Sequence, residues 1–268
     1  MNKQYRIKAF IGVVAVVLSV SAFATVASAS HSWGGYHWAR TANPFTLKLG
    51  DNVGAIWDTR LVATSYDWSI SSVLDTNIVP GQSKKNCRPT NGRVEVCNKT
   101  YGNNGWLGIA SIWASGGHIT QGTVKLNDTY FNTAKYNTTA WRQFVMCQEV
   151  GHTFGLDHQD EIFTNINLGT CMDYTNDPSG VLYNQPSNER PNTHDYDMLD
   201  TIYAHFDSIT TLLNKISGVA PARVSDIDTE NPSEWGKVIR KSNDGRSSLH
   251  ERNLGNGQKV FTFVIWAD

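Results

Sequence analysis

One segment constrains the fold of this chain more than any other: CQEVGHTFGLDH, which ends at His158. Residues four apart share one face of a helix, so Gln148 and His152 can point at the same place while Glu149 stands beside them. Gly155 can adopt a positive φ and end the helix sharply, which lets His158 approach that place from outside the helix. The segment therefore predicts a metal site on a helix and the turn that follows it.

The N-terminus has the pattern of a secretory signal peptide. Three positive charges lie within the first eight residues, residues 9–20 are nearly all apolar, and Ala-Ser-Ala at 27–29 offers the small side chains that a signal peptidase reads. We expect residues 1–29 to be removed and the mature protein to be secreted. An uncleaved anchor is the alternative, because the uncharged stretch 9–29 is long enough to span a bilayer.

Charge excludes several classes of partner. The chain has 268 residues with 23 Lys and Arg against 24 Asp and Glu, and loss of the signal peptide leaves a net charge of about −4. Such a chain has no basic field to gather nucleic acid or an anionic bilayer. We expect no nucleic-acid partner, no membrane attachment after signal cleavage, and a monomer.

Because thiols pair in an oxidising compartment, we expect the four cysteines of the exported chain to form disulfide bonds. Cys87 and Cys97 bracket the turn sequence at 89–92, which brings them together and leaves Cys147 to pair with Cys171. A four-cysteine zinc site is the rival interpretation, but the closely spaced cysteine pairs it requires are absent.

Hydrophobic spacing indicates α+β order rather than repeated βαβ units. We predict strands near 45–49, 94–101, 106–113 and 119–126, and helices over 57–68, from 138 to Gly155, and over 193–207. Past Ser217 the chain turns polar and proline-containing before an apolar end. We therefore divide the mature chain into a main domain, 30–217, and a linker with a small β extension, 218–268. A separate C-terminal binding module is the alternative.

The motif of the first segment, QExxHxxGxxH, resembles the HExxHxxGxxH motif of the metzincin zinc endopeptidases, and within them the secreted, matrixin-like members. A turn containing methionine, Thr-Cys-Met-Asp-Tyr at 170–174, follows at an ordinary distance. The resemblance covers roughly residues 36–210. It implies a zincin fold with a twisted, mostly parallel sheet, an antiparallel edge strand, an active-site helix and a C-terminal helix.

The resemblance also implies roles for the residues of the motif. Glu149 is the general base, Met172 lies beneath the metal, and Tyr174 matches a metal-facing tyrosine and is counted with the catalytic residues. The implied Zn²⁺ ligands are His152, His158 and, in place of the first histidine, Gln148.

Peptide substrates of metzincins bind antiparallel to an exposed edge strand. The segment before the Gly-rich turn at 115–117 lies at a suitable distance before the metal helix. We therefore expect substrate-binding backbone from Trp106, Leu107, Gly108, Ile109, Ala110, Ser111 and Ile112.

Gln148 is the departure from the family motif. Its amide oxygen can coordinate a cation, but zinc prefers imidazole nitrogen, so the ion should be held less tightly. Two functions remain open: a zinc endopeptidase acting on protein or peptide substrates, and an inactive metzincin-like protein that binds a peptide or partner. A structural zinc protein is disfavoured, because a structural site is closed by four protein ligands and has no use for Glu149.

Other signals are weaker. The sequence has no GxSxG elbow and no phosphate-cradling GxxxxGK[ST] loop. His118 follows Gly116 and Gly117, and we interpret it as a turn histidine, with a second metal ligand as the alternative. Calcium is compatible with the chain, but no motif specifies a site for it.

Overall fold

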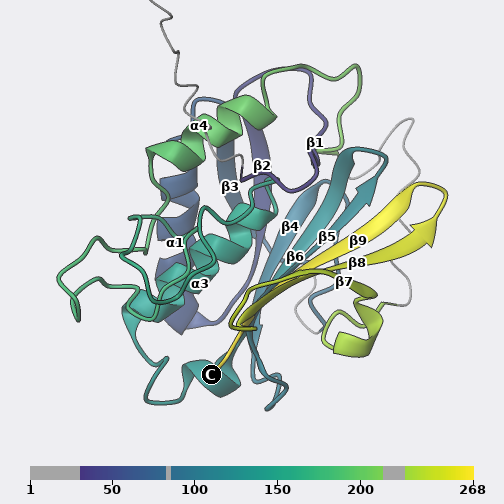
Figure 1. Cartoon of the computed structure of the whole chain (residues 1–268). Helices are drawn as coiled ribbons and strands as arrows, with labels where there is room; N and C mark the ends of the chain where they lie inside the picture. The colour runs from purple at the N-terminus through teal and green to yellow at the C-terminus, as the bar shows by residue number, and fades with distance from the viewer. Residues whose placement is uncertain (1–30, 83–85, 214–226) are drawn as a thin grey trace, which may run out of the picture.

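The computed structural model describes residues 31–82, 86–213 and 227–268. The predicted signal peptide and the first part of the predicted linker, 218–226, lie outside the described residues. The described elements, shown in Figure 1, are β1 (His37–Trp38), β2 (Phe45–Asn52), α1 (Ala55–Trp68), β3 (Leu74–Pro80), β4 (Arg93–Lys99), β5 (Trp106–Ser115), β6 (His118–Asn127), α2 (Asp128–Phe131), α3 (Thr139–His152), α4 (Thr193–Ile202), the 3₁₀ turn η1 (Pro232–Glu234), β7 (Lys237–Lys241), β8 (Ser247–Gly255) and β9 (Gln258–Trp266).

One sheet organises these elements. Its strand order is β3-β2-β4-β6-β5-β9-β8-β7, and β1 pairs with β6 off this path. The pairs among β1, β2, β3, β4 and β6 are parallel, whereas β5, β7, β8 and β9 pair antiparallel. A parallel body with helices agrees with the predicted α+β class, and the strands predicted near 45–49, 94–101, 106–113 and 119–126 are confirmed as β2, β4, β5 and β6.

Helices α1 and α3 lie side by side against one face of the sheet (Figure 1). Helix α1 buries Trp57, Leu61 and Trp68, whose helical spacing predicted it. Helix α3 begins where the Thr138 side chain accepts a hydrogen bond from the Trp141 backbone N–H at 3.1 Å, as the cap sequence predicted.

Helix α4 is shorter than predicted and ends at Ile202 rather than at Asp207. The Arg40 guanidinium explains the early end, because its Nη2 donates to the carbonyl of Tyr203 at 2.7 Å and also to that of His205. The backbone N–H of Asp207, which would bond to the Tyr203 carbonyl in a longer helix, instead donates to the carbonyl of Arg40 at 2.9 Å. The chain leaves the helix there and returns to β1.

The predicted edge strand is not an edge. Strand β5 lies between β6 and β9, with Ala110 opposite Phe263 in the antiparallel register with β9. The physical reason lies in the end of the chain, where Phe263 faces the main core while Val264 faces a second cluster with Trp106. A strand that is apolar on both faces must be covered on both faces, and the position beside β5 provides this.

Both predicted disulfides are confirmed, Cys87 with Cys97 and Cys147 with Cys171. Among the described residues, no helix has the length and apolar character needed to cross a bilayer.

Candidate metal centre

Helix α3 and the turn after it bring the predicted metal residues together. Gln148, Glu149 and His152 lie on its last two turns and are at most 1% exposed. Gly155 ends the helical path with φ +101°, a conformation that L side chains rarely adopt. His158 then returns to the helix, and its ring lies 4.5 Å from that of His152 between centroids, at 88°.

Both histidines present the same nitrogen. Nδ1 of His152 lies 2.9 Å from the carbonyl oxygen of Leu156, which can only accept, so the proton sits on Nδ1 and Nε2 carries a lone pair. Nδ1 of His158 lies 3.2 Å from a carboxylate oxygen of Glu161, and its Nε2 is buried without a hydrogen-bond partner. Burial, with a smaller effect from His158, holds the pKa of His152 well below its usual range, so the ring is neutral.

Gln148 and Glu149 add two more buried acceptors. Nε2 of Gln148 donates to the carbonyl of Cys171 at 3.0 Å, which identifies Oε1 as the free end of the amide. That Oε1 and Oε2 of Glu149 are both buried without a hydrogen-bond partner. Burial raises the pKa of Glu149 well above its usual range, and a hydrogen bond from the backbone of Ala110 opposes this rise. Buried acceptors without a hydrogen-bond partner can be satisfied by a cation, so the residues present fit the implied zinc ion.

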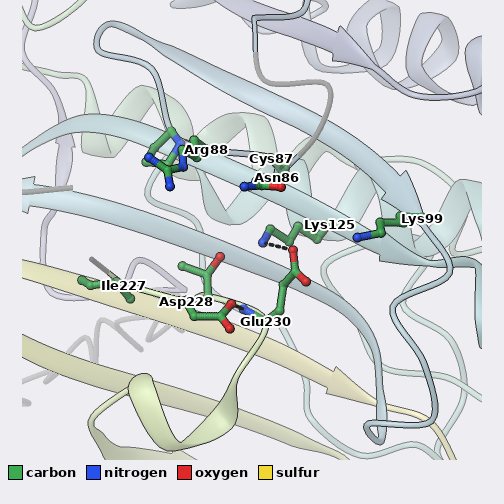
Figure 2. Close-up of a pocket in the computed structure, with 10 residues that line it drawn as sticks. Asn86, Cys87, Arg88, Lys99, Lys125, Ile227, Asp228 and Glu230 are labelled. Atoms are coloured by element: carbon green, nitrogen blue, oxygen red, sulfur yellow. Dashed lines mark hydrogen bonds and ion pairs between the residues drawn. The ribbon is translucent and has the colours of Figure 1, made fainter. Parts of the chain in front are cut away.

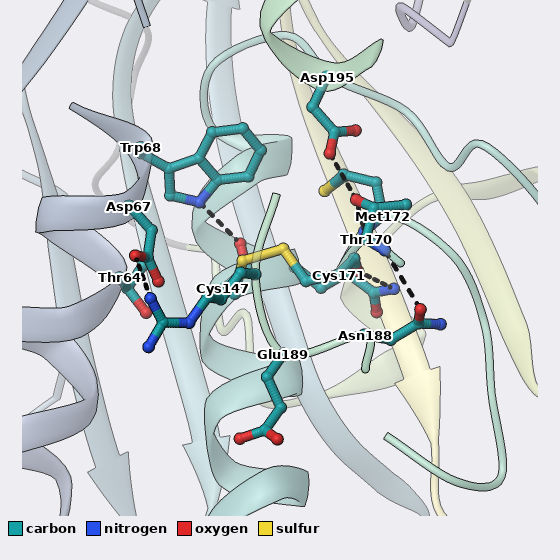
Figure 3. Close-up of a disulfide and its surroundings, with 12 residues drawn as sticks. Thr64, Asp67, Trp68, Cys147, Thr170, Cys171, Met172, Asn188, Glu189 and Asp195 are labelled. Atoms are coloured by element: carbon teal, nitrogen blue, oxygen red, sulfur yellow. Dashed lines mark hydrogen bonds and ion pairs between the residues drawn. A yellow bond between two sulfur atoms is a disulfide. The ribbon is translucent and has the colours of Figure 1, made fainter. Parts of the chain in front are cut away.

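The methionine turn lies against the helix, as the resemblance implied. Gly151 permits this approach, because a Cβ built there would stand only 2.6 Å from Sδ of Met172. Figure 3 shows the disulfide that joins Cys147 of α3 to Cys171 of the turn. On one side of it the Trp68 indole donates to the Cys147 carbonyl at 3.2 Å. The bridge therefore holds the turn against the metal helix.

Tyr174 lies beside His158, with 4.3 Å between the ring centroids. Its side chain is buried, and Ser247 of β8 is a hydrogen-bond partner of its hydroxyl. Burial raises the pKa of Tyr174 well above its usual value, so the phenol keeps its proton.

The C-terminal strands cover this site, which sequence reasoning missed. Phe263 of β9 stacks on His152 with 4.0 Å between centroids and 11° between planes. Arg240 of β7 forms ion pairs with Asp157 and, at 3.0 Å, with Glu161. Burial is the largest single influence on the pKa of Asp157 and raises it, but the hydrogen bond from Arg240 and the charges of His158 and Arg240 together lower the pKa below its usual value. The nearly continuous apolar run of residues 260–266 is the available signal, and it predicts a small β extension without saying where that extension packs.

A groove of about 480 Å³ remains beside the covered site. It lies between the segment 32–36 and the C-terminal strands, and it reaches Asp157, the neighbour of His158. Phe261 and Arg240 also line it, so the same strands that cover His152 form one of its walls.

A second hollow, of about 380 Å³, lies away from the predicted metal residues (Figure 2). Lys125 of β6 and Glu230 form an ion pair across it at 3.0 Å. Lys125 points away from the helices, because its neighbours Val124 and Leu126 belong to the main core. This hollow contains none of the predicted zinc ligands.

Comparison of the chain with protein-family models, with curated proteins and with solved structures found no match in any of the three.

Proposed function

We propose that the protein is a secreted zinc endopeptidase of metzincin type, and that its C-terminal strands hold it in a closed, latent state. One observation carries the proposal. Acceptors on Gln148, Glu149 and His158 are buried without hydrogen-bond partners at one helix end and its turn. Zinc is the cation that this donor set fits, with two imidazoles, one amide oxygen and a position left for water.

The chemistry divides between the ion and the chain. A zinc ion held by Gln148, His152 and His158 would supply Lewis-acid polarisation and an acidified water. Glu149, beside these ligands, would act as the general base for the attacking water and as the proton donor to the leaving amine. Nδ1 of His152 and of His158 stay bonded to Leu156 and Glu161, which keeps both rings turned with Nε2 inward.

Cleavage requires β9 to move. Phe263 lies where a substrate residue would approach His152, and β9 takes up the backbone groups of β5 that an extended peptide would use. The edge-strand role proposed for residues 106–112 therefore applies only to an open state. We propose that the enzyme is latent because its own strand β9 excludes the substrate.

An inactive, partner-binding protein is the second candidate, and the cover over the site favours it. If β9 never leaves, Gln148 and the histidines hold a zinc ion that no substrate reaches. The two candidates differ in whether removal of the cover releases a peptidase.

The test compares four full-length proteins in zinc-replete buffer on an unfolded protein substrate: wild type, Phe263→Ala, Glu149→Ala and the double variant. We expect Phe263→Ala to cleave faster than wild type and the double variant to lose about 10²- to 10⁴-fold relative to Phe263→Ala, the usual contribution of a general base. Zinc content should be equal in all four, because Glu149 is not a ligand in this scheme.

Equal cleavage with and without Glu149 would falsify the endopeptidase reading. A fifth protein, Phe263→Ala with Gln148→His, is made if none of the four cleaves, and cleavage by it alone would identify a protease disabled at one ligand. If that variant is inactive as well, the partner-binding candidate replaces the enzyme.

A further inference from the structure

One carboxylate oxygen joins the C-terminal strands to a proposed zinc ligand. Oε1 of Glu161 lies 3.2 Å from Nδ1 of His158 and 3.0 Å from Nε of Arg240. Glu161 and His158 lie in the segment after α3, whereas Arg240 belongs to β7, which is far away in sequence. His158 and Arg240 therefore donate to the same acceptor.

Asp157 strengthens this connection. Both of its carboxylate oxygens accept from the terminal nitrogens of Arg240, and its Oδ1 also accepts from the backbone N–H of His158 at 2.8 Å. One ligand atom each of Asp157, His158 and Glu161 lies within 4.8 Å of the others, a spacing that a metal ion could bridge. The Arg240 guanidinium pairs with both carboxylates, so it supplies the cation that this group of acceptors attracts.

The protonation states follow from these contacts. The hydrogen bond with His158 is the largest influence on the pKa of Glu161 and lowers it, burial raises it, and Arg240 is among the groups that lower it further, so the carboxylate is ionised. An ionised carboxylate can only accept a hydrogen bond, which assigns the proton of the neutral His158 ring to Nδ1. Nε2 of His158, buried without a hydrogen-bond partner, is left with a lone pair.

Arg240 opposes a cation at that nitrogen in two ways. A carboxylate that accepts from Nδ1 makes the other ring nitrogen a stronger metal ligand. Arg240 competes for Oε1 of Glu161 and so weakens this effect. Its positive charge, held beside the site, also repels a second cation. Both contributions lower the affinity of the α3 site for zinc while β7 is docked.

We propose that Arg240 is a positioning residue that acts through Glu161 and lowers the zinc affinity of the α3 site, so that zinc binding and docking of β7 oppose each other. Linkage makes the effect reciprocal, because the factor by which docking of β7 weakens zinc binding is the factor by which zinc weakens docking. Zinc therefore favours release of the strands that exclude substrate. The proposal rests on the zinc site of the proposed function, but it does not require peptidase activity.

The test measures zinc affinity in the full-length protein by competition with a chelator of known affinity, and His158→Ala identifies the zinc that belongs to the α3 site. We expect Arg240→Gln to bind zinc about fivefold more tightly than wild type, a modest coupling between two sites. Glu161→Gln should bind zinc about 10- to 100-fold more weakly, the usual effect of losing such a partner of a metal ligand.

The double variant shows whether Arg240 acts through Glu161. Once Glu161→Gln is present, adding Arg240→Gln should change the zinc affinity by no more than about twofold, the scatter expected of independent sites. Lys237→Gln is the matched control, because it removes a positive charge from the exposed part of the same strand and should bind zinc like wild type.

Two readouts separate positioning from a merely structural role. Glu161→Gln should shift the visible absorption of Co²⁺ bound at the α3 site, since His158 then loses its carboxylate partner. Zinc should also speed amide hydrogen exchange in β7 of wild type, and Arg240→Gln should lose this response.

Equal zinc affinity in wild type and Arg240→Gln would overturn the proposal and leave the zinc site in place. Weaker binding by Arg240→Gln would overturn it as well, because Arg240 would then support the ligand. If His158→Ala binds zinc as tightly as wild type, the α3 site holds no zinc, and the proposed function fails together with this inference. Coupled affinities without cleavage by any variant would support the inference and favour the partner-binding candidate.

Discussion

The two histidine clusters differ most in what covers them. At the α3 site, His152 is 1% exposed and lies under Phe263. Where β1 meets the segment after α4, His37, His118 and His205 gather around Asp207, and the His205 side chain is 54% exposed. The α3 site is thus closed by the chain's own strand, whereas the cluster on β1 is open to solvent.

Removal of the Phe263 ring that covers the α3 site should give the largest effect, an increase in the cleavage rate. Phe263→Ala deletes a buried aromatic ring, a change that costs about 3–5 kcal/mol in a packed core, and much of that cost should weaken the docking of β9 on β5. We expect cleavage of an unfolded protein to rise at least about tenfold, since a docking loss of only 1.4 kcal/mol shifts the open population by that factor.

Val264 provides the matched control, because it is the next residue of β9 and faces the opposite side of the sheet. Val264→Ala removes less apolar volume and uncovers no part of His152. A rise in cleavage as large as that of Phe263→Ala would show that general loosening of the strand, not exposure of His152, controls activity.

The replacement of Gln148 should give the next largest effect, a change in zinc affinity at the α3 site. In Gln148→His an imidazole nitrogen replaces an amide oxygen at the same helix position, so we expect zinc to bind about tenfold more tightly or better. Competition with a chelator of known affinity measures this. Unchanged affinity would argue that Gln148 is not a ligand.

Replacement of Arg240 should give the smallest effect, a slight loss of unfolding free energy. Its side chain is 36% exposed, so its ion pairs with Asp157 and Glu161 are partly screened and we expect Arg240→Gln to cost less than about 1 kcal/mol of unfolding free energy. Lys237→Gln, on the exposed part of the same strand, should cost less still. A loss from Arg240→Gln comparable to that from Phe263→Ala would make the ion pairs, rather than the aromatic ring, the main closure.

The two clusters also differ in how much the sequence could predict. The α3 site could be predicted because Gln148, His152 and His158 lie on one helix and its turn, where spacing determines direction. The Cys87–Cys97 bridge could be predicted for the same reason, since a short turn joins its ends. Such inferences need only local geometry.

The rest depends on contacts between distant segments. The apolar run of residues 260–266 indicates a buried strand, but it does not say which strand lies beside it, so the pairing with β5 and the position of Phe263 could not be predicted. His118 follows a turn, as predicted, but its contacts with His37 and Asp207 could not be predicted. These partners come from β1 and from the segment after α4, which are distant in sequence. Helix α4 ends earlier than predicted where Arg40, far away in the chain, binds the carbonyl of Tyr203 just past the helix.

The rate of zinc uptake at the α3 site tests most directly the claim that β9 closes it. Metal-free protein is mixed with Zn²⁺ and a coloured zinc indicator, and the loss of free ion is followed with time. We predict slow uptake limited by movement of β9, which Phe263→Ala should accelerate far more than Val264→Ala. Fast uptake in wild type, or a rate that Phe263→Ala leaves unchanged, would contradict the account.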